Sequence, residues 1–183
     1  MTILRKTIIS LFLMFTSIVV NADNLDDFIS TLSEQTILTY WVYNNSIDTV
    51  TTDKAAVIVK SVYVNATNQN MNPHLILAVI KTESRFNEKA ESSEGAKGLM
   101  QVMPKFHKDK LKGRNTKNID VSIEVGSMVL NECLKKHHHK LDKGLNCYSG
   151  SSTSTYRKVV MANKASLTKY LQQFYHRTQV ASL

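Results

Sequence analysis

Apolar residues recur every three or four positions along much of this chain, which is the spacing of amphipathic helices. Four segments carry the pattern most clearly, and a less regular apolar pattern before them allows one short helix or two over residues 23–52. The predicted helices cover residues 53–68, 73–84, 121–138 and 155–175. The eight residues after the last helix are expected to form a frayed tail. We therefore expect a mainly α-helical domain.

The helix predicted over residues 73–84 has a clear start. Asn72 is suited to cap it, and Pro73 occupies a first-turn position where its missing N–H is not needed. Three apolar residues share one face with Glu83, which they precede by seven, four and three positions: Ile76, Val79 and Ile80. Glu83 therefore continues an apolar stripe.

A carboxyl group at the end of a buried face has altered chemistry. Removal from water disfavours the ionised form and raises the pKa of Glu83, as a general acid requires near neutral pH. The alternative is a glutamate that bends away to solvent, toward Arg85 or Lys81. The residues that follow favour the buried acid.

Residues 83–104 resemble a known family motif. Their small residues permit a sharp turn, and by composition alone they also fit a turn into another core helix. The segment resembles the signature of the soluble lytic transglycosylases, relatives of goose-type lysozyme, at fixed spacing and without a gap. The matching positions are Glu83-Ser84, Phe86, Ala90, Ser92, Gly95-Ala96, Gly98-Leu99-Met100-Gln101 and Met103-Pro104.

Two later blocks also resemble this family. One covers residues 118–130, and the other covers residues 147–151, where Ser149 replaces the usual asparagine. The resemblance implies a compact lysozyme-like domain over residues 23–183, with its motif core at about 70–163. It implies Glu83 as the catalytic residue, and substrate contacts from Ser92, Met100, Gln101 and Tyr148. Tyr148 is expected to place its hydroxyl near Glu83, although it also suits a half-buried turn.

The resemblance implies peptidoglycan as substrate and cleavage without a cofactor or metal. Glu83 would protonate the oxygen between N-acetylmuramic acid and N-acetylglucosamine, in a β-1,4 bond, and then deprotonate the C6 hydroxyl to form a 1,6-anhydro ring. No second carboxylate is required, so Glu88, Glu91 and Glu94 are expected to be solvated. Hydrolysis, as in goose-type lysozyme, remains an alternative.

The first 22 residues are typical of a cleaved secretory signal. Arg5 and Lys6 precede an apolar run over residues 8–20, which is shorter than the roughly 20 residues that span a bilayer. We therefore expect export to the periplasm and no stable membrane span. The formal charge falls from +8 to 8 − 2 = +6 without this segment, which suits an anionic polymer. No nucleic-acid motif is present, and no nucleic-acid partner is expected.

Two cysteines and three consecutive histidines remain. Cys133 and Cys147 either form a disulfide, as an exported pair allows, or stay as buried thiols. Side chains of His137, His138 and His139 would point about 100° apart on a helix and could not converge on one metal ion. An exposed helix end is the better interpretation.

A non-catalytic function is the main alternative. The chain could be a peptidoglycan-binding component of a secretion, pilus or conjugation apparatus. Glu83 argues against this alternative, and Ser149 argues weakly for it. An enzyme that opens the wall locally for such an apparatus would have the same location.

Overall fold

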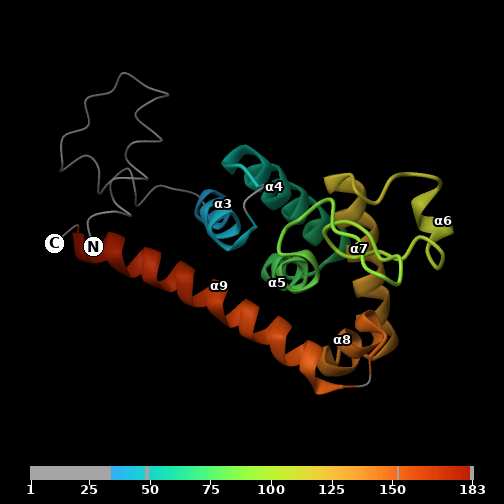
Figure 1. Ribbon diagram of the computed structural model, residues 1–183. Coiled ribbons are helices and arrows are strands. Elements are labelled where there is room, and N and C mark those ends of the chain that lie inside the picture. Colours follow the sequence, from blue (N-terminus) through green and yellow to red (C-terminus); the bar gives the residue numbers. More distant parts are fainter. Residues whose placement is uncertain (1–33, 48–49, 152, 182–183) are drawn as a thin grey trace. The chain divides into compact units, whose positions relative to one another are not determined.

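The computed structural model describes residues 34–47, 50–151 and 153–181 (Figure 1). These residues form helices and no sheet, which confirms the mainly α-helical expectation. The helices are α3 (Glu34–Asn45), α4 (Thr52–Gln69), α5 (Pro73–Ser84), α6 (Lys108–Leu111), α7 (Ile119–Lys136), α8 (Leu141–Ser149) and α9 (Ser154–Ala181). The predicted signal segment, residues 1–22, lies outside the described residues.

The chain divides into two compact units. Residues 33–174 form one of them, which includes Glu83 and the helices α3 to α8. Residues 1–32 and 175–183 form the other, of which the described part is the end of α9. The frayed tail predicted from residue 176 is therefore wrong as far as Ala181, because the backbone hydrogen-bonding of α9 continues to that residue.

The start of α5 agrees with the sequence, whereas the start of α4 does not. Asn72 caps α5, since its side chain accepts hydrogen bonds from two backbone N–H groups. Asp53 begins the helix predicted over residues 53–68 and is the cap expected from the sequence. The cap of α4 is instead Thr51, because Thr51 has the extended backbone that precedes a helix and its hydroxyl accepts from the N–H of Lys54. Asp53 lies within the first turn, where its charge suits the helix dipole.

Two apolar residues assigned to buried faces lie outside. Val57 and Val159 belong to the apolar stripes of the helices predicted over residues 53–68 and 155–175, but Val57 is 46% exposed and Val159 is 43% exposed, so their expected burial is wrong. The apolar residues next to them, Ile58 and Val160, do face the core. Residues 105–117 are rich in lysine, and a solvated loop is the expectation from the sequence; the segment contains the short helix α6 and buries Leu111.

The core forms where α4 contacts α3, α5 and α7. Trp41 of α3 is 1% exposed and packs edge-to-face against Phe86, with ring centroids 5.9 Å apart. From the sequence, Trp41 is expected in the core, with stacking on a sugar as the alternative, and its burial confirms the core position. Because α4 holds both α5 and α7, the core fixes the end of α5 relative to the face of α7.

Among the described residues, no helix combines the length and apolar character needed to cross a bilayer.

Candidate active site

Glu83 lies in the last turn of α5, at the edge of the core. The apolar residues that share its face, Ile76, Val79 and Ile80, are fully buried, as their spacing predicts. The helix ends at once after this turn, since Arg85 adopts a left-handed backbone and its N–H donates to the carbonyl of Lys81. The buried apolar residues of α5 and the end of this helix at Arg85 together keep the carboxyl group of Glu83 mostly buried.

Tyr156 is the direct partner of the Glu83 carboxyl group. Its hydroxyl donates a hydrogen bond of 2.5 Å to Oε1 of Glu83. A second contact joins the same two helices, because Asn163 of α9 donates from Nδ2 to Oγ1 of Thr82 at 3.0 Å. Tyr156 belongs to the helix predicted over residues 155–175, but the helical pattern does not reveal this contact with Glu83. The hydroxyl of a buried tyrosine on an apolar helix face needs a polar partner, and this feature of the sequence could have indicated the contact.

The environment of Glu83 shifts its pKa. Burial raises the pKa to about 7, and the hydrogen bond from Tyr156 acts in the opposite direction. The group therefore changes protonation near neutral pH. A carboxyl with this pKa can give a proton and take one back, as a general acid and base must.

The loop after α5 folds back on itself through short backbone contacts. The N–H of Gly98 donates to the carbonyl of Ala90 at 2.9 Å, and Lys97 and Val102 exchange two hydrogen bonds. Gly98 has a φ of +79°, and a Cβ there would lie 2.0 Å from the carbonyl oxygen of Thr116. Only glycine fits this position. The resulting turn brings residues 99–101 next to the end of α5.

Met100 is held from three sides. Its N–H donates to Ser122 Oγ at 3.1 Å, its carbonyl accepts from the Tyr148 hydroxyl at 2.7 Å, and its side chain packs on Gly126. The side chain is 0% exposed and does not line the cavity. Met100 is therefore a buried support of this loop in the structure, and its contact with substrate stays a prediction.

A cavity of about 590 Å³ opens beside Glu83. It is bounded by the loop after α5, one face of α7 and the end of α8. Its lining residues are Glu83, Ser92, Ala96, Gln101, Val102, Met103, Phe106, His107, Val129, Glu132, Cys133, Lys136, Cys147, Tyr148, Ser149 and Gly150. Three of the four predicted substrate-contact residues are thus gathered with Glu83 around one space.

These three residues differ in what they offer a ligand. Ser92 Oγ accepts from the N–H of Ala96 at 3.0 Å, which leaves its own proton to donate. The amide nitrogen of Gln101 donates to two loop carbonyls, so its amide oxygen is the group left for a ligand. The Tyr148 hydroxyl is committed to Met100, and the carboxyl of Glu83 is bonded by Tyr156. Tyr148 nevertheless lies close to Glu83, because burial and, after it, the charge of the Glu83 carboxylate raise the pKa of this phenol.

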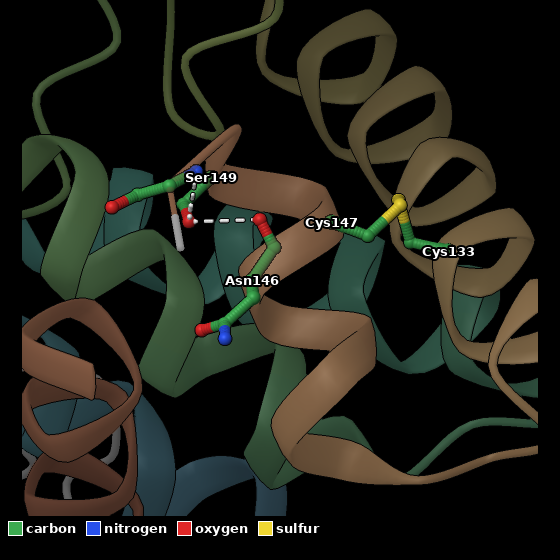
Figure 2. The surroundings of a disulfide bond; sticks show 5 residues. Cys133, Asn146, Cys147 and Ser149 are labelled. Carbon is green, nitrogen blue, oxygen red and sulfur yellow. Dashed lines mark hydrogen bonds between the residues drawn. A yellow bond between two sulfur atoms is a disulfide. The ribbon is translucent and has the colours of Figure 1, made fainter. Parts of the chain in front are cut away.

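A disulfide links Cys133 of α7 to Cys147 of α8, with Cα atoms 5.6 Å apart (Figure 2). Of the two states that the sequence left open for these cysteines, the structure contains the disulfide. Both cysteines line the cavity. The bond therefore ties α8, with Tyr148 at its end, to the cavity face of α7.

Ser149 bonds within its own helix end. Its hydroxyl donates to the carbonyl of Asn146 at 3.2 Å and accepts from the N–H of Ser151 at 3.3 Å (Figure 2). An asparagine here would reach further than this short side chain. The Oδ1 atom of Asn146 is buried and has no hydrogen-bond partner among the described residues, and nothing in the structure explains it.

Other carboxylates nearby are held in ion pairs. Glu91 contacts Lys97 and Lys117, and Glu94 is exposed as expected. Glu88 is less solvated than predicted, because Lys54 binds it at 2.8 Å against α4. In the cavity itself Glu132 is 60% exposed and pairs with Lys110 at 3.1 Å. The pKa of the Glu91 carboxyl is lowered by its hydrogen bonds to Lys117 and Lys97, whereas burial raises that of Glu83.

The three histidines follow the end of α7 at Lys136. His138 and His139 adopt left-handed backbone and are exposed. Over the described residues, no cluster of three or more histidine, cysteine, aspartate or glutamate side chains could hold a metal ion.

Comparison with known proteins identifies a family and similar solved structures. The model of the "Transglycosylase SLT domain" family matches residues 60–170, which include Glu83, the loop after α5, α7, α8 and Tyr156. An inactive mutant of lytic transglycosylase Slt from Pseudomonas aeruginosa is similar at 19% identity with a TM-score of 0.47. The match covers 68% of this chain and 24% of that protein, so the chain spans about a quarter of its length.

Proposed function

We propose that this chain, which belongs to the transglycosylase SLT domain family, cleaves the glycan strands of peptidoglycan by lytic transglycosylation. The single observation that carries the proposal is Glu83, mostly buried beside the cavity with its pKa raised to about 7. The family membership supplies the class of substrate. The geometry supplies one carboxyl group suited to act first as acid and then as base.

The proposed bond is the β-1,4 link from N-acetylmuramic acid to N-acetylglucosamine. In the first step, protonated Glu83 gives its proton to the glycosidic oxygen, and the bond from that oxygen to C1 of the muramic acid breaks. The acetamido oxygen of the same sugar bonds to C1 and supports the positive charge. Pairs of catalytic carboxylates, as in ordinary glycosidases, are then unnecessary.

In the second step, ionised Glu83 removes the proton from the C6 hydroxyl of the same muramic acid. Oxygen O6 attacks C1 and displaces the acetamido oxygen, which closes the 1,6-anhydro ring and returns Glu83 to its protonated form. Tyr156 would hold the carboxyl group in place through both steps, because its hydroxyl bonds to Oε1. Ser92 and the Gln101 amide oxygen are the proposed sugar contacts.

A peptidoglycan-binding role without catalysis is the second candidate. Turnover of purified sacculi by the wild type and by Glu83→Gln separates the two, with Glu94→Gln as the matched control because Glu94 is exposed and lies outside the cavity lining. The proposal expects wild type and Glu94→Gln to release soluble fragments, and Glu83→Gln to bind sacculi without releasing any. If all three proteins bind and none releases fragments, the enzyme proposal is wrong.

We also propose that the protein acts in the periplasm and opens the wall locally for an envelope-spanning apparatus. The secretory pattern of residues 1–22 and the disulfide, which suits an oxidising compartment, support the location. Fractionation of cells that produce the full chain tests it, and recovery of the protein in the cytosol with both cysteines reduced would contradict it. Co-purification of the protein with membrane-embedded proteins of an envelope-spanning apparatus tests the proposal that it opens the wall for such an apparatus.

A further inference from the structure

The cavity continues along one face of α7. Four of its lining residues follow one another on that face: Val129, Glu132, Cys133 and Lys136. Gly126 of the same helix packs on Met100, close to the acid. Lys136 lies about 15 Å further along the helix axis, at the helical rise of roughly 1.5 Å per residue. The far part of the cavity can therefore meet groups of a substrate that do not react.

Among the described residues, the charged side chain at this far end that has no ion-pair partner is Lys136. Glu132 is paired with Lys110, whose ammonium lies 3.1 Å from the carboxylate. His107 also lines the cavity, and burial and the charge of Lys110 lower its pKa, so its ring is neutral near pH 7. In the part of the chain that the structure describes, no carboxylate lies within ion-pair distance of Lys136. Lys110, which also contacts Asp109 at 3.3 Å, thus pairs with Glu132, an acid one turn away from Lys136 that could otherwise pair with it.

We propose that Lys136 binds a carboxylate on the peptide stem of the glycan strand and makes the enzyme select strands that carry such stems. This inference rests on the proposed function. In peptidoglycan the lactyl carboxyl of N-acetylmuramic acid is consumed in the amide bond to the stem, so the free carboxylates lie on the peptide. An ammonium group with three N–H donors is suited to such an anion.

The test compares kcat/KM on three polymers: peptide-bearing strands, the same strands with their carboxylates converted to amides, and strands stripped of peptide by an amidase. The proteins are the full-length mature chain, Lys136→Gln and Lys135→Gln. Lys135 is the matched control, because it is also exposed near the end of α7 but does not line the cavity. The quantity to report is the preference for unmodified over amidated strands.

Wild type and Lys135→Gln should have a kcat/KM about fivefold higher on unmodified than on amidated strands, which is the order of one partly exposed charged contact. Lys136→Gln should reduce this ratio to near one. A wild type that cleaves both polymers equally overturns the inference and leaves the proposed function intact, whereas a wild type that cleaves neither overturns both.

Two further results would also overturn it. The first is an equal loss of preference in Lys136→Gln and Lys135→Gln, since the effect would then come from the general positive charge. The second is a loss of kcat/KM in Lys136→Gln that is as large on stripped strands as on peptide-bearing strands. Stripped strands carry only lactyl carboxylates, so such a loss could not come from binding to the peptide.

Discussion

Glu83 combines a buried position with access to a cavity, and its protonation controls the proposed reaction. Its pKa is raised to about 7, so the protonated form that starts the reaction predominates below that pH and is lost above it. The value of kcat/KM is therefore expected to be high near pH 6 and to fall about tenfold per pH unit well above pH 7. Initial rates on sacculi between pH 5 and 9 measure this. A profile that stays flat to pH 9 would show that another group supplies the proton.

Tyr156 tunes this carboxyl group and holds it. Because its hydrogen bond opposes the upward shift, Tyr156→Phe should raise the pKa of Glu83 further and move the fall in kcat/KM to higher pH. The maximal rate should fall about tenfold, since the carboxyl group loses its only direct partner among the described side chains. Tyr43→Phe is the control, because Tyr43 is exposed on α3. A loss of rate without any shift in the pH profile would mean that Tyr156 serves stability alone.

At the scale of elements, the loop after α5 depends on one glycine. Gly98→Ala should lower the free energy of unfolding by about 3 kcal/mol, because the new Cβ would meet the Thr116 carbonyl and the backbone has a positive φ. Gly95→Ala is the matched control, since its φ is +87° but no atom lies within 4 Å of a Cβ there. It should cost about 1 kcal/mol. Urea denaturation measures both, and equal losses would refute the steric argument.

The positions of the helices could be predicted from the sequence better than the contacts between side chains of different helices. The apolar stripe and the Asn72-Pro73 start located α5 and the burial of Glu83's face, because both depend on local spacing. The Tyr156 contact joins residues 73 positions apart, and no local pattern reports which hydroxyl will meet which acid. The burial of Met100 was missed for a similar reason, since Gly126 and Ser122 of another helix surround it. Family resemblance named Ser92, Gln101 and Tyr148, which line the cavity, but it did not give their hydrogen-bond partners.

For the molecule as a whole, the disulfide joins the two elements that carry one wall of the cavity. It closes a loop with a sequence separation of 14, so its removal should lower the free energy of unfolding by about 3 kcal/mol in the loop-entropy account. Thermal or urea unfolding of the double variant Cys133→Ser/Cys147→Ser measures this. A reducing agent should destabilise the wild type to a similar extent and leave the double variant unchanged. Equal stability of wild type and double variant would contradict the prediction.

The central claim is that one carboxyl group breaks the strand and lets the sugar close on itself without water. Mass spectrometry of the fragments released from sacculi tests it most directly. The wild type should yield fragments that end in 1,6-anhydromuramic acid, lighter by one water than hydrolysed fragments, and Glu83→Gln should yield none. Reducing muramic acid ends from the wild type, or anhydro ends from Glu83→Gln, would contradict it.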